Sequence, residues 1–129
     1  MLAVGEELLG QVPDVLLRAS CPFGGGVGGG HAELCGVLSG AVLLLGARFG
    51  RTLPSESDER LFELVRRYRE QFMRLAGGSQ CECIRNSLPE VEKRCLPIVV
   101  EGTRLLLRML AEFSVEGDRV VANDPASDV

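Results

Sequence analysis

Residues 33–49 constrain the fold more than any other part of the chain. Apolar side chains occupy nearly every side of a helix drawn through this segment, and Gly36 and Gly40 lie one turn apart on it. A helix that is apolar all round is buried on several sides. A glycine inside a helix costs roughly 1 kcal/mol relative to alanine, so we expect another helix backbone or a ligand to approach this face. The segment therefore predicts the central helix of a bundle.

The other apolar residues also recur with helical spacing, and no segment sustains the period-two alternation of a strand. Ser55, followed by acidic residues, indicates the start of a helix, and Gly77 ends it. We therefore predict an all-α, single-domain bundle over 1–113, with three main helices and short N-terminal ones, and a flexible tail over 114–129. The remaining predicted helices cover 2–9, 13–20 and 96–113, with 79–88 as a connector and 89–94 as one further helical turn.

The formal net charge is −4, which excludes a nucleic-acid partner because phosphate binding needs a concentrated basic surface. The longest apolar stretch, residues 37–47, is too short to span a membrane, and no basic leader precedes it. We therefore expect a cytoplasmic protein with no membrane span. In a reducing compartment its five cysteines would not form a static disulfide framework. They would be core residues, redox thiols or metal ligands.

The position of Cys35 favours a reactive thiol. It follows a run of glycines and opens the central helix, and the N-terminus of a helix stabilises a thiolate. Cys95, which lies beside Pro97 at the start of the last helix, occupies a similar place. Nearby Glu33 would oppose thiolate formation, whereas His31 would favour it if protonated or hydrogen-bonded.

Two further cysteines, Cys81 and Cys83, form a C-x-C pair. A disulfide between such close neighbours is strained and easily reduced. If Cys35, Cys81 and Cys95 converge, with Cys83 or Cys21 as a fourth ligand, they could hold zinc or an iron–sulfur cluster. The same convergence could serve dithiol–disulfide exchange, and the spacing leaves both open.

The glycine run also matches the G-x-G-x-x-G pattern of dinucleotide-binding loops. Such a site needs a preceding strand and an acidic residue about 20 positions later, and the sequence has neither. The run predicts instead a lid that lets a partner reach Cys35, or backbone N–H groups that hold an anion or a reduced sulfur. The candidate cofactor-binding residues are Gly24, Gly25, Gly26 and Gly36.

Three blocks of the sequence, residues 23–28, 33–41 and 45–50, resemble the C_GCAxxG_C_C family of small redox-active proteins. The resemblance covers roughly residues 2–113 and implies that Cys35, Cys81 and Cys95 are three of the four family cysteines. The fourth, near the start of the first helix, has no counterpart here. Cys21 is expected to be structural, or else to take the place of that cysteine. The resemblance implies a thiol function without naming a reaction.

Three functions remain open. The first is a thiol redox protein in which Cys35 attacks, Cys95 or Cys81 resolves, and the redox partner is an unidentified protein or small molecule. The second is a metal or iron–sulfur module with Cys35, Cys81, Cys83 and Cys95 as ligands. The third is an interaction domain in which the cysteines only pack. The glycine-rich helix face would also suit a homodimer.

Overall fold

The computed structural model describes residues 2–92 and 95–122. In this part of the chain it contains helices, turns and one isolated β-bridge, and no sheet, which confirms the all-α prediction. None of the described helices is long and apolar enough to cross a membrane. The elements are α1 (Leu2–Leu9), α2 (Asp14–Ser20), η1 (Cys21–Phe23), α3 (Gly36–Phe49), α4 (Glu59–Ala76), α5 (Cys81–Ser87), η2 (Glu90–Glu92) and α6 (Leu96–Ala122).

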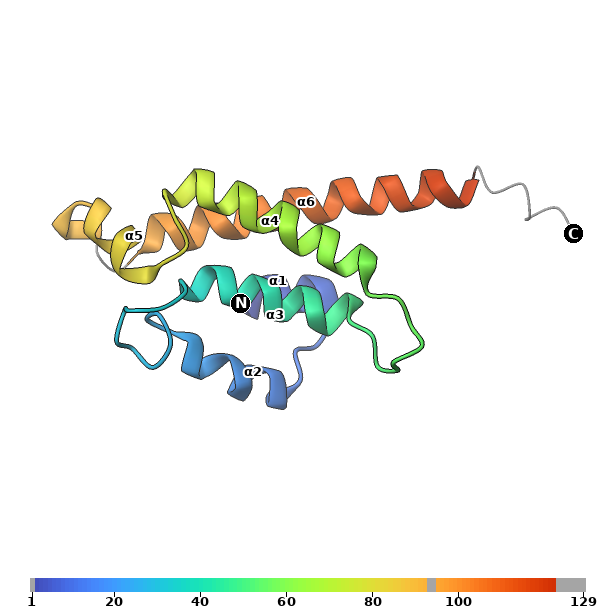
Figure 1. The fold of residues 1–129 in the computed structure, drawn as a ribbon, viewed down its shortest axis with the longest axis horizontal. Helices are drawn as coiled ribbons and strands as arrows, with labels where there is room; N and C mark the ends of the chain where they lie inside the picture. Colours follow the sequence, from blue (N-terminus) through green and yellow to red (C-terminus); the bar gives the residue numbers. More distant parts are fainter. Residues whose placement is uncertain (1, 93–94, 123–129) are drawn as a thin grey trace, which may run out of the picture.

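The predicted central helix, α3, lies in the middle of the bundle (Figure 1). Helices α4 and α6 cross on one side of it and contact both each other and α3, while α1 packs against α3 and α2 lies on the opposite side. Leu45 of α3 and both Tyr68 and Phe72 of α4 are completely buried. The Tyr68 hydroxyl donates a hydrogen bond of 3.1 Å to the carbonyl of Gly102, which joins α4 to α6 inside the core.

Several predicted boundaries are wrong because tertiary contacts decide them. Helix α3 begins at Gly36 and not at residue 33, since Leu34 forms a β-bridge with Gln80. The predicted connector 79–88 contains the helix α5. Of the predicted turn over 89–94, Glu90–Glu92 forms a 3-10 helix, and residues 93–94 lie outside the described residues.

The last helix, α6, continues to Ala122, nine residues beyond the predicted end at residue 113. Figure 1 shows this helix extending past the rest of the bundle. The division into a domain over 1–113 and a flexible tail over 114–129 stays a prediction. Residues 123–129 of that tail lie outside the described residues.

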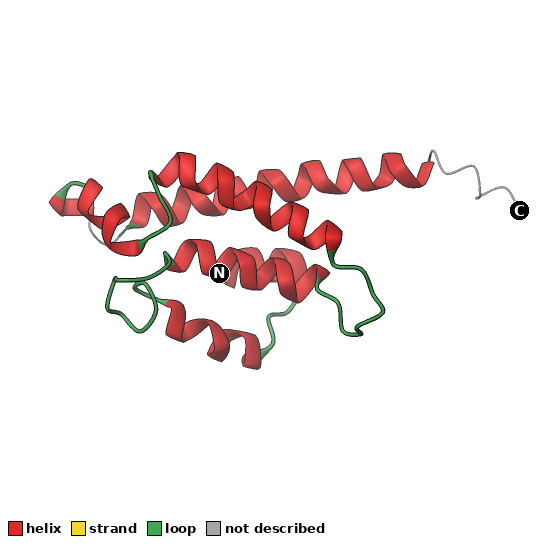
Figure 2. Ribbon diagram, viewed as in Figure 1, coloured by secondary structure: helices red, strands yellow, loops and turns green. Residues whose placement is uncertain are grey.

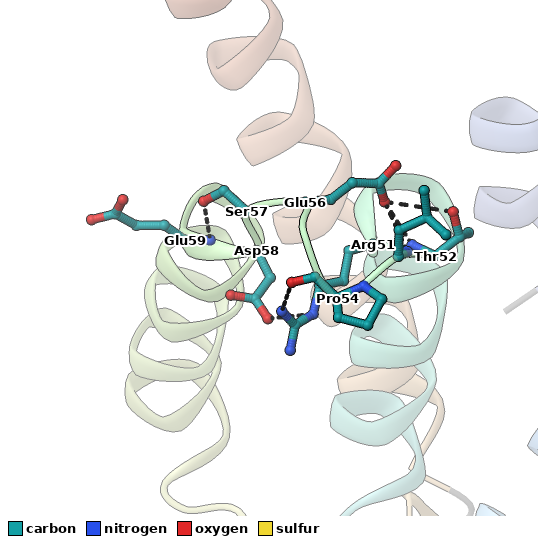
Figure 3. A network of polar contacts seen from close by, with 8 residues as sticks. Arg51, Thr52, Pro54, Glu56, Ser57, Asp58 and Glu59 are labelled. Atoms are coloured by element: carbon teal, nitrogen blue, oxygen red, sulfur yellow. Dashed lines mark hydrogen bonds and ion pairs between the residues drawn. The ribbon is translucent and has the colours of Figure 1, made fainter.

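Two long loops lie at opposite ends of α3 (Figure 2). The loop after α3, residues 50–58, is closed by its own polar side chains (Figure 3). The Glu56 carboxylate accepts hydrogen bonds from the N–H groups of Thr52 (2.8 Å) and Leu53 (3.2 Å), and Arg51 pairs with Asp58 at 3.1 Å. These contacts hold residues 52–56 in a turn, so α4 starts at Glu59 and not behind Ser55.

Candidate thiol site

Four of the five cysteines line one cavity of about 630 Å³ beside the N-terminal half of α3. Cys21 lies in η1, Cys35 immediately precedes α3, Cys81 is the first residue of α5, and Cys95 immediately precedes α6. Cys35 and Cys81 are buried, Cys95 is half-buried and Cys21 is exposed. We call this part of the molecule, with the four cysteines and the loop 24–35, the cysteine end. The structure thus brings together the three predicted catalytic residues and adds Cys21.

Main-chain hydrogen bonds join the segment that carries Cys35 to the segment that carries Cys81. The N–H of Cys35 donates to the carbonyl of Ser79 at 2.8 Å, and the N–H of Cys81 donates to the carbonyl of Glu33 at 2.9 Å. The first N–H groups of a helix have no partner inside the helix. Here a neighbouring segment supplies those partners, so the backbone itself fixes the relative position of the two cysteines. We call this pairing of residues 31–35 with 79–82 the backbone clamp.

His31 belongs to the same clamp. Its carbonyl accepts a hydrogen bond of 2.8 Å from the N–H of Glu82, and its Nδ1 lies 3.4 Å from the Cys81 Sγ. Gly26, with φ +71°, permits this arrangement, because a Cβ there would lie 2.6 Å from the Cys81 Cβ and 2.9 Å from the His31 Cα. One glycine of the loop therefore places the only histidine of the chain against a cysteine.

The glycine loop is a set of turns with its own hydrogen bonds. The N–H groups of Gly28 and His31 donate to the carbonyls of Pro22 (2.7 Å) and Gly25 (2.8 Å). These two N–H groups are therefore used within the loop and are not available to hold an anion. Of the candidate cofactor-binding glycines, Gly24, Gly25 and Gly36 line the cavity. Gly26 does not line it and lies close to Cys81. Their cofactor-binding role stays a prediction.

The thiols influence one another electrostatically. Burial raises the pKa of the Cys81 thiol, and negative charge on Cys35 and on Cys95 raises it further. Burial, and then negative charge on Cys35, likewise raise the pKa of Cys95, while Arg85 opposes both shifts. We expected the start of the last helix to favour a Cys95 thiolate. The shift has the opposite direction, because burial and the neighbouring thiolate outweigh the favourable charge.

Cys83 does not join the other cysteines. It is exposed and does not line the cavity, and its Sγ lies 3.8 Å from the Gln80 Oε1. Because Cys81 and Cys83 lie on a helix, side chains two residues apart do not face each other. No group of three or more His, Cys, Asp or Glu side chains in the described residues is arranged to hold a metal ion. The predicted quartet of Cys35, Cys81, Cys83 and Cys95 therefore does not form a ligand set around one point.

Gly40, which the sequence marks as a place where a helix or a ligand approaches, lines the cavity, whereas sequence reasoning missed two polar residues of its wall, Tyr68 and Arg85. Burial, and then negative charge on Cys35, raise the pKa of Tyr68, so its hydroxyl stays protonated and remains a donor. Arg85 follows Cys81 by four residues, which places both on one side of α5. The four-residue spacing of Cys81 and Arg85 is informative only on a helix, and the sequence predicts a connector here.

The family model described as "Putative redox-active protein (C_GCAxxG_C_C)" matches residues 1–109, which is most of the chain. The chain belongs to this family. No match is found among curated proteins or among solved structures. The family confirms the resemblance drawn from the glycine loop and Cys35, and its description as redox-active fits a site with several cysteines.

Proposed function

We propose that this protein carries out thiol–disulfide exchange in the cavity, with Cys35 as the central thiol. One observation carries the proposal: Cys35, Cys81 and Cys95 come from three separate segments to the same cavity, and the charge of Cys35 acts on both of the others. Cys35 belongs to the hydrophobic core and Cys95 packs against it, but all three cysteines also border a space large enough for a small molecule. A reducing cytoplasm, which the sequence predicts, would return the disulfide to the dithiol.

The reaction balances with a disulfide as the oxidant. The Cys35 thiolate attacks one sulfur of the substrate disulfide, which forms a mixed disulfide and releases one substrate thiol. The thiolate of Cys81 or Cys95 then attacks the Cys35 sulfur, which forms a protein disulfide and releases the second substrate thiol. The substrate gains two electrons from the two cysteines, and the two thiol protons end on the released thiolates.

Two neighbouring side chains support these proton movements. His31 lies 3.4 Å from the Cys81 Sγ, within reach for taking a proton from that thiol before it attacks. Arg85 acts against the raised pKa values of Cys81 and Cys95, because its positive charge favours their thiolate forms. Cys81 is the preferred resolving thiol, since His31 gives it a proton acceptor.

The test treats the fully reduced protein with hydroxyethyl disulfide under argon, followed by thiol counting and peptide mapping by mass spectrometry. We expect a single protein disulfide that joins Cys35 to Cys81 or Cys95 and is reversed by reductant. Cys35→Ser should abolish it, while Cys83→Ser should leave it intact because Cys83 lies outside the cavity. Undiminished disulfide formation in Cys35→Ser would overturn the proposal.

A further inference from the structure

We propose that the cavity selects a small, mainly apolar disulfide whose aliphatic part lies against Gly40 of α3. The inference rests on the proposed exchange reaction and names the class of its substrate. It is carried by the size of the cavity, the character of its walls and one buried glycine that the packing of the protein does not explain.

The dimensions suit a small molecule. A cavity of about 630 Å³ falls within the roughly 300–1,000 Å³ that is usual for ligand pockets. It reaches from Cys35, at the start of α3, to Leu44 on the same helix. At 1.5 Å per residue this is roughly 13 Å along the helix axis. The thiols are therefore at one end of an elongated space.

The far part of this space is apolar. Its lining includes Val4 of α1, Ala41 and Leu44 of α3 and Leu106 of α6. Among the described lining residues Arg85 is the only one with a permanent charge, and none is a carboxylate. An ionic substrate, such as a peptide disulfide with several charges, would lose hydration there without regaining partners. The walls therefore favour an apolar substrate.

Gly40 is the position in α3 where we expect the substrate to contact the helix backbone. It is buried in the middle of α3, yet a Cβ at this position would meet nothing within 4 Å. Packing explains the neighbouring glycines of the cavity wall: a Cβ on Gly36 would lie 3.0 Å from the Phe23 carbonyl oxygen, and one on Gly102 would lie 2.6 Å from the Val37 Cγ1. A helical glycine costs roughly 1 kcal/mol relative to alanine. A ligand that packs on the bare backbone at Gly40 accounts for that cost.

The position of the thiols and the shape of the cavity favour one orientation of the substrate. A five-membered cyclic disulfide on an aliphatic chain would place its S–S bond beside Cys35 and its chain along Gly40 towards Leu44. The exchange then proceeds as above: the ring S–S bond breaks, a disulfide forms between Cys35 and the resolving cysteine, and the substrate leaves as a dithiol. The ring keeps both substrate sulfurs in one product, so nothing else is released.

The test uses two probes on the full-length reduced protein. Lipoamide, a neutral dithiolane with an aliphatic chain, reports exchange, and its all-carbon analogue 5-cyclopentylpentanamide reports binding alone by calorimetry. Gly40→Ala should lower the affinity for the analogue about tenfold or more, because the methyl group takes the space of the ligand. The same variant should be more stable than the parent when unliganded, since alanine favours the helix.

Gly46→Ala is the matched control. Gly46 lies in the same helix, its Cβ position is also open, and it does not line the cavity. This variant should gain stability and keep the affinity of the parent. Equal affinity of Gly40→Ala and Gly46→Ala, or no binding of the analogue to the parent protein, would overturn the inference. Oxidation of the thiols by glutathione disulfide as fast as by lipoamide would overturn it as well.

The same set of measurements separates this inference from the proposed function. If hydroxyethyl disulfide still produces the Cys35 disulfide while the analogue fails to bind, exchange stands and the substrate class is wrong. If the analogue binds with the expected Gly40 dependence while no disulfide oxidises the thiols, the exchange reaction is wrong.

Discussion

At its C-terminal end α3 leads into the loop 50–58, whereas its N-terminal end follows the glycine loop (Figure 1). The cavity lies beside this N-terminal end. Side chains close the C-terminal end of α3, which we call the distal end. The rings of Phe49 and Phe113 meet edge to face at 5.5 Å, the Arg60 guanidinium lies 4.1 Å from the Phe113 ring, and Arg51 pairs with Asp58. At the cysteine end, the hydrogen bonds of the backbone clamp join residues 31–35 to residues 79–82.

Packed side chains and backbone hydrogen bonds have different consequences for the space at the two ends of α3. Side chains that fill an end leave no room for a ligand, and each of them contributes to stability through its own packing. Hydrogen bonds between two backbone segments hold the cysteine end together without filling it. Cys35 and Cys81 therefore keep a fixed position beside open space, which is what a binding and reaction site needs.

The largest expected effect concerns Gly26. Gly26→Ala should destabilise the protein by about 3 kcal/mol, because an alanine at positive φ is strained and its Cβ would overlap Cys81 and His31. Urea unfolding of the reduced protein measures this loss. Gly30→Ala, at a position with open space and no positive φ, is the control and should change little. Equal stability of the two variants would show that the loop does not need Gly26.

The next effect belongs to the distal end. Phe113→Ala should cost about 2 kcal/mol, since it removes the contacts with Phe49 and Arg60 from a half-buried ring. Thermal or urea unfolding measures the loss. If the two ends are independent, the rate at which Cys35 and Cys95 react with iodoacetamide under native conditions should not change. A faster reaction in this variant would break the comparison, because distal packing would then control the thiols.

A smaller effect appears at alkaline pH. The pKa values of Cys81 and Cys95 are raised in the folded protein, so their contribution to stability is complete below the pKa of an unfolded cysteine. It is lost as the pH rises towards the folded values, because the unfolded chain releases these protons first. The free energy of unfolding, measured with reductant at about pH 7 and about pH 10, should therefore fall.

Serine variants locate the source of that fall. Replacing both Cys81 and Cys95 by serine should make the alkaline loss of stability smaller, whereas Cys83→Ser should leave it unchanged because Cys83 is exposed. An alkaline loss of the same size in the double variant would contradict the assignment.

The smallest effect concerns Glu56 in the distal loop. Hydrogen bonds from the N–H groups of Thr52 and then Leu53 hold the pKa of this carboxyl below its usual value. Glu56→Gln should therefore reduce stability slightly at neutral pH, and the difference should vanish as the pH falls through the folded pKa. Urea unfolding between about pH 3 and about pH 7 measures it, with the exposed Glu63→Gln as the control. A difference that persists in acid would rule out the carboxylate as its cause.

The sequence predicted the large features because they depend on local periodicity. The apolar surface of α3 and the stripe through Tyr68 and Phe72 require buried helices wherever those helices pack. Helix α5 was missed because seven residues carry too little periodic signal, and its start is set by the clamp with residues 31–35. Tertiary contacts of this kind have no local signature.

The candidate site was predictable only in part. The resemblance to the family, and not the spacing of the cysteines, implied that Cys35, Cys81 and Cys95 belong together. Cys21 and Arg85 line the cavity because of where η1 and α5 are placed around it. The direction of the Cys95 pKa shift depends on burial and on its distance from Cys35. Adjacent residues in the sequence predict neither the placement of Cys21 and Arg85 nor the direction of this pKa shift.

The opening of the backbone clamp can be followed through the exchange of its amide hydrogens. Amide hydrogens in the first turn of a helix usually exchange with deuterated water early, because they have no partner inside the helix. The amide hydrogens of Cys35, Cys81 and Glu82 are bonded instead to carbonyls of the opposite segment. Their rate of isotope exchange therefore reports how often the two segments separate. Since no side chain makes these bonds, many substitutions around the cysteines would leave that rate, and the spacing of the thiols, as it is.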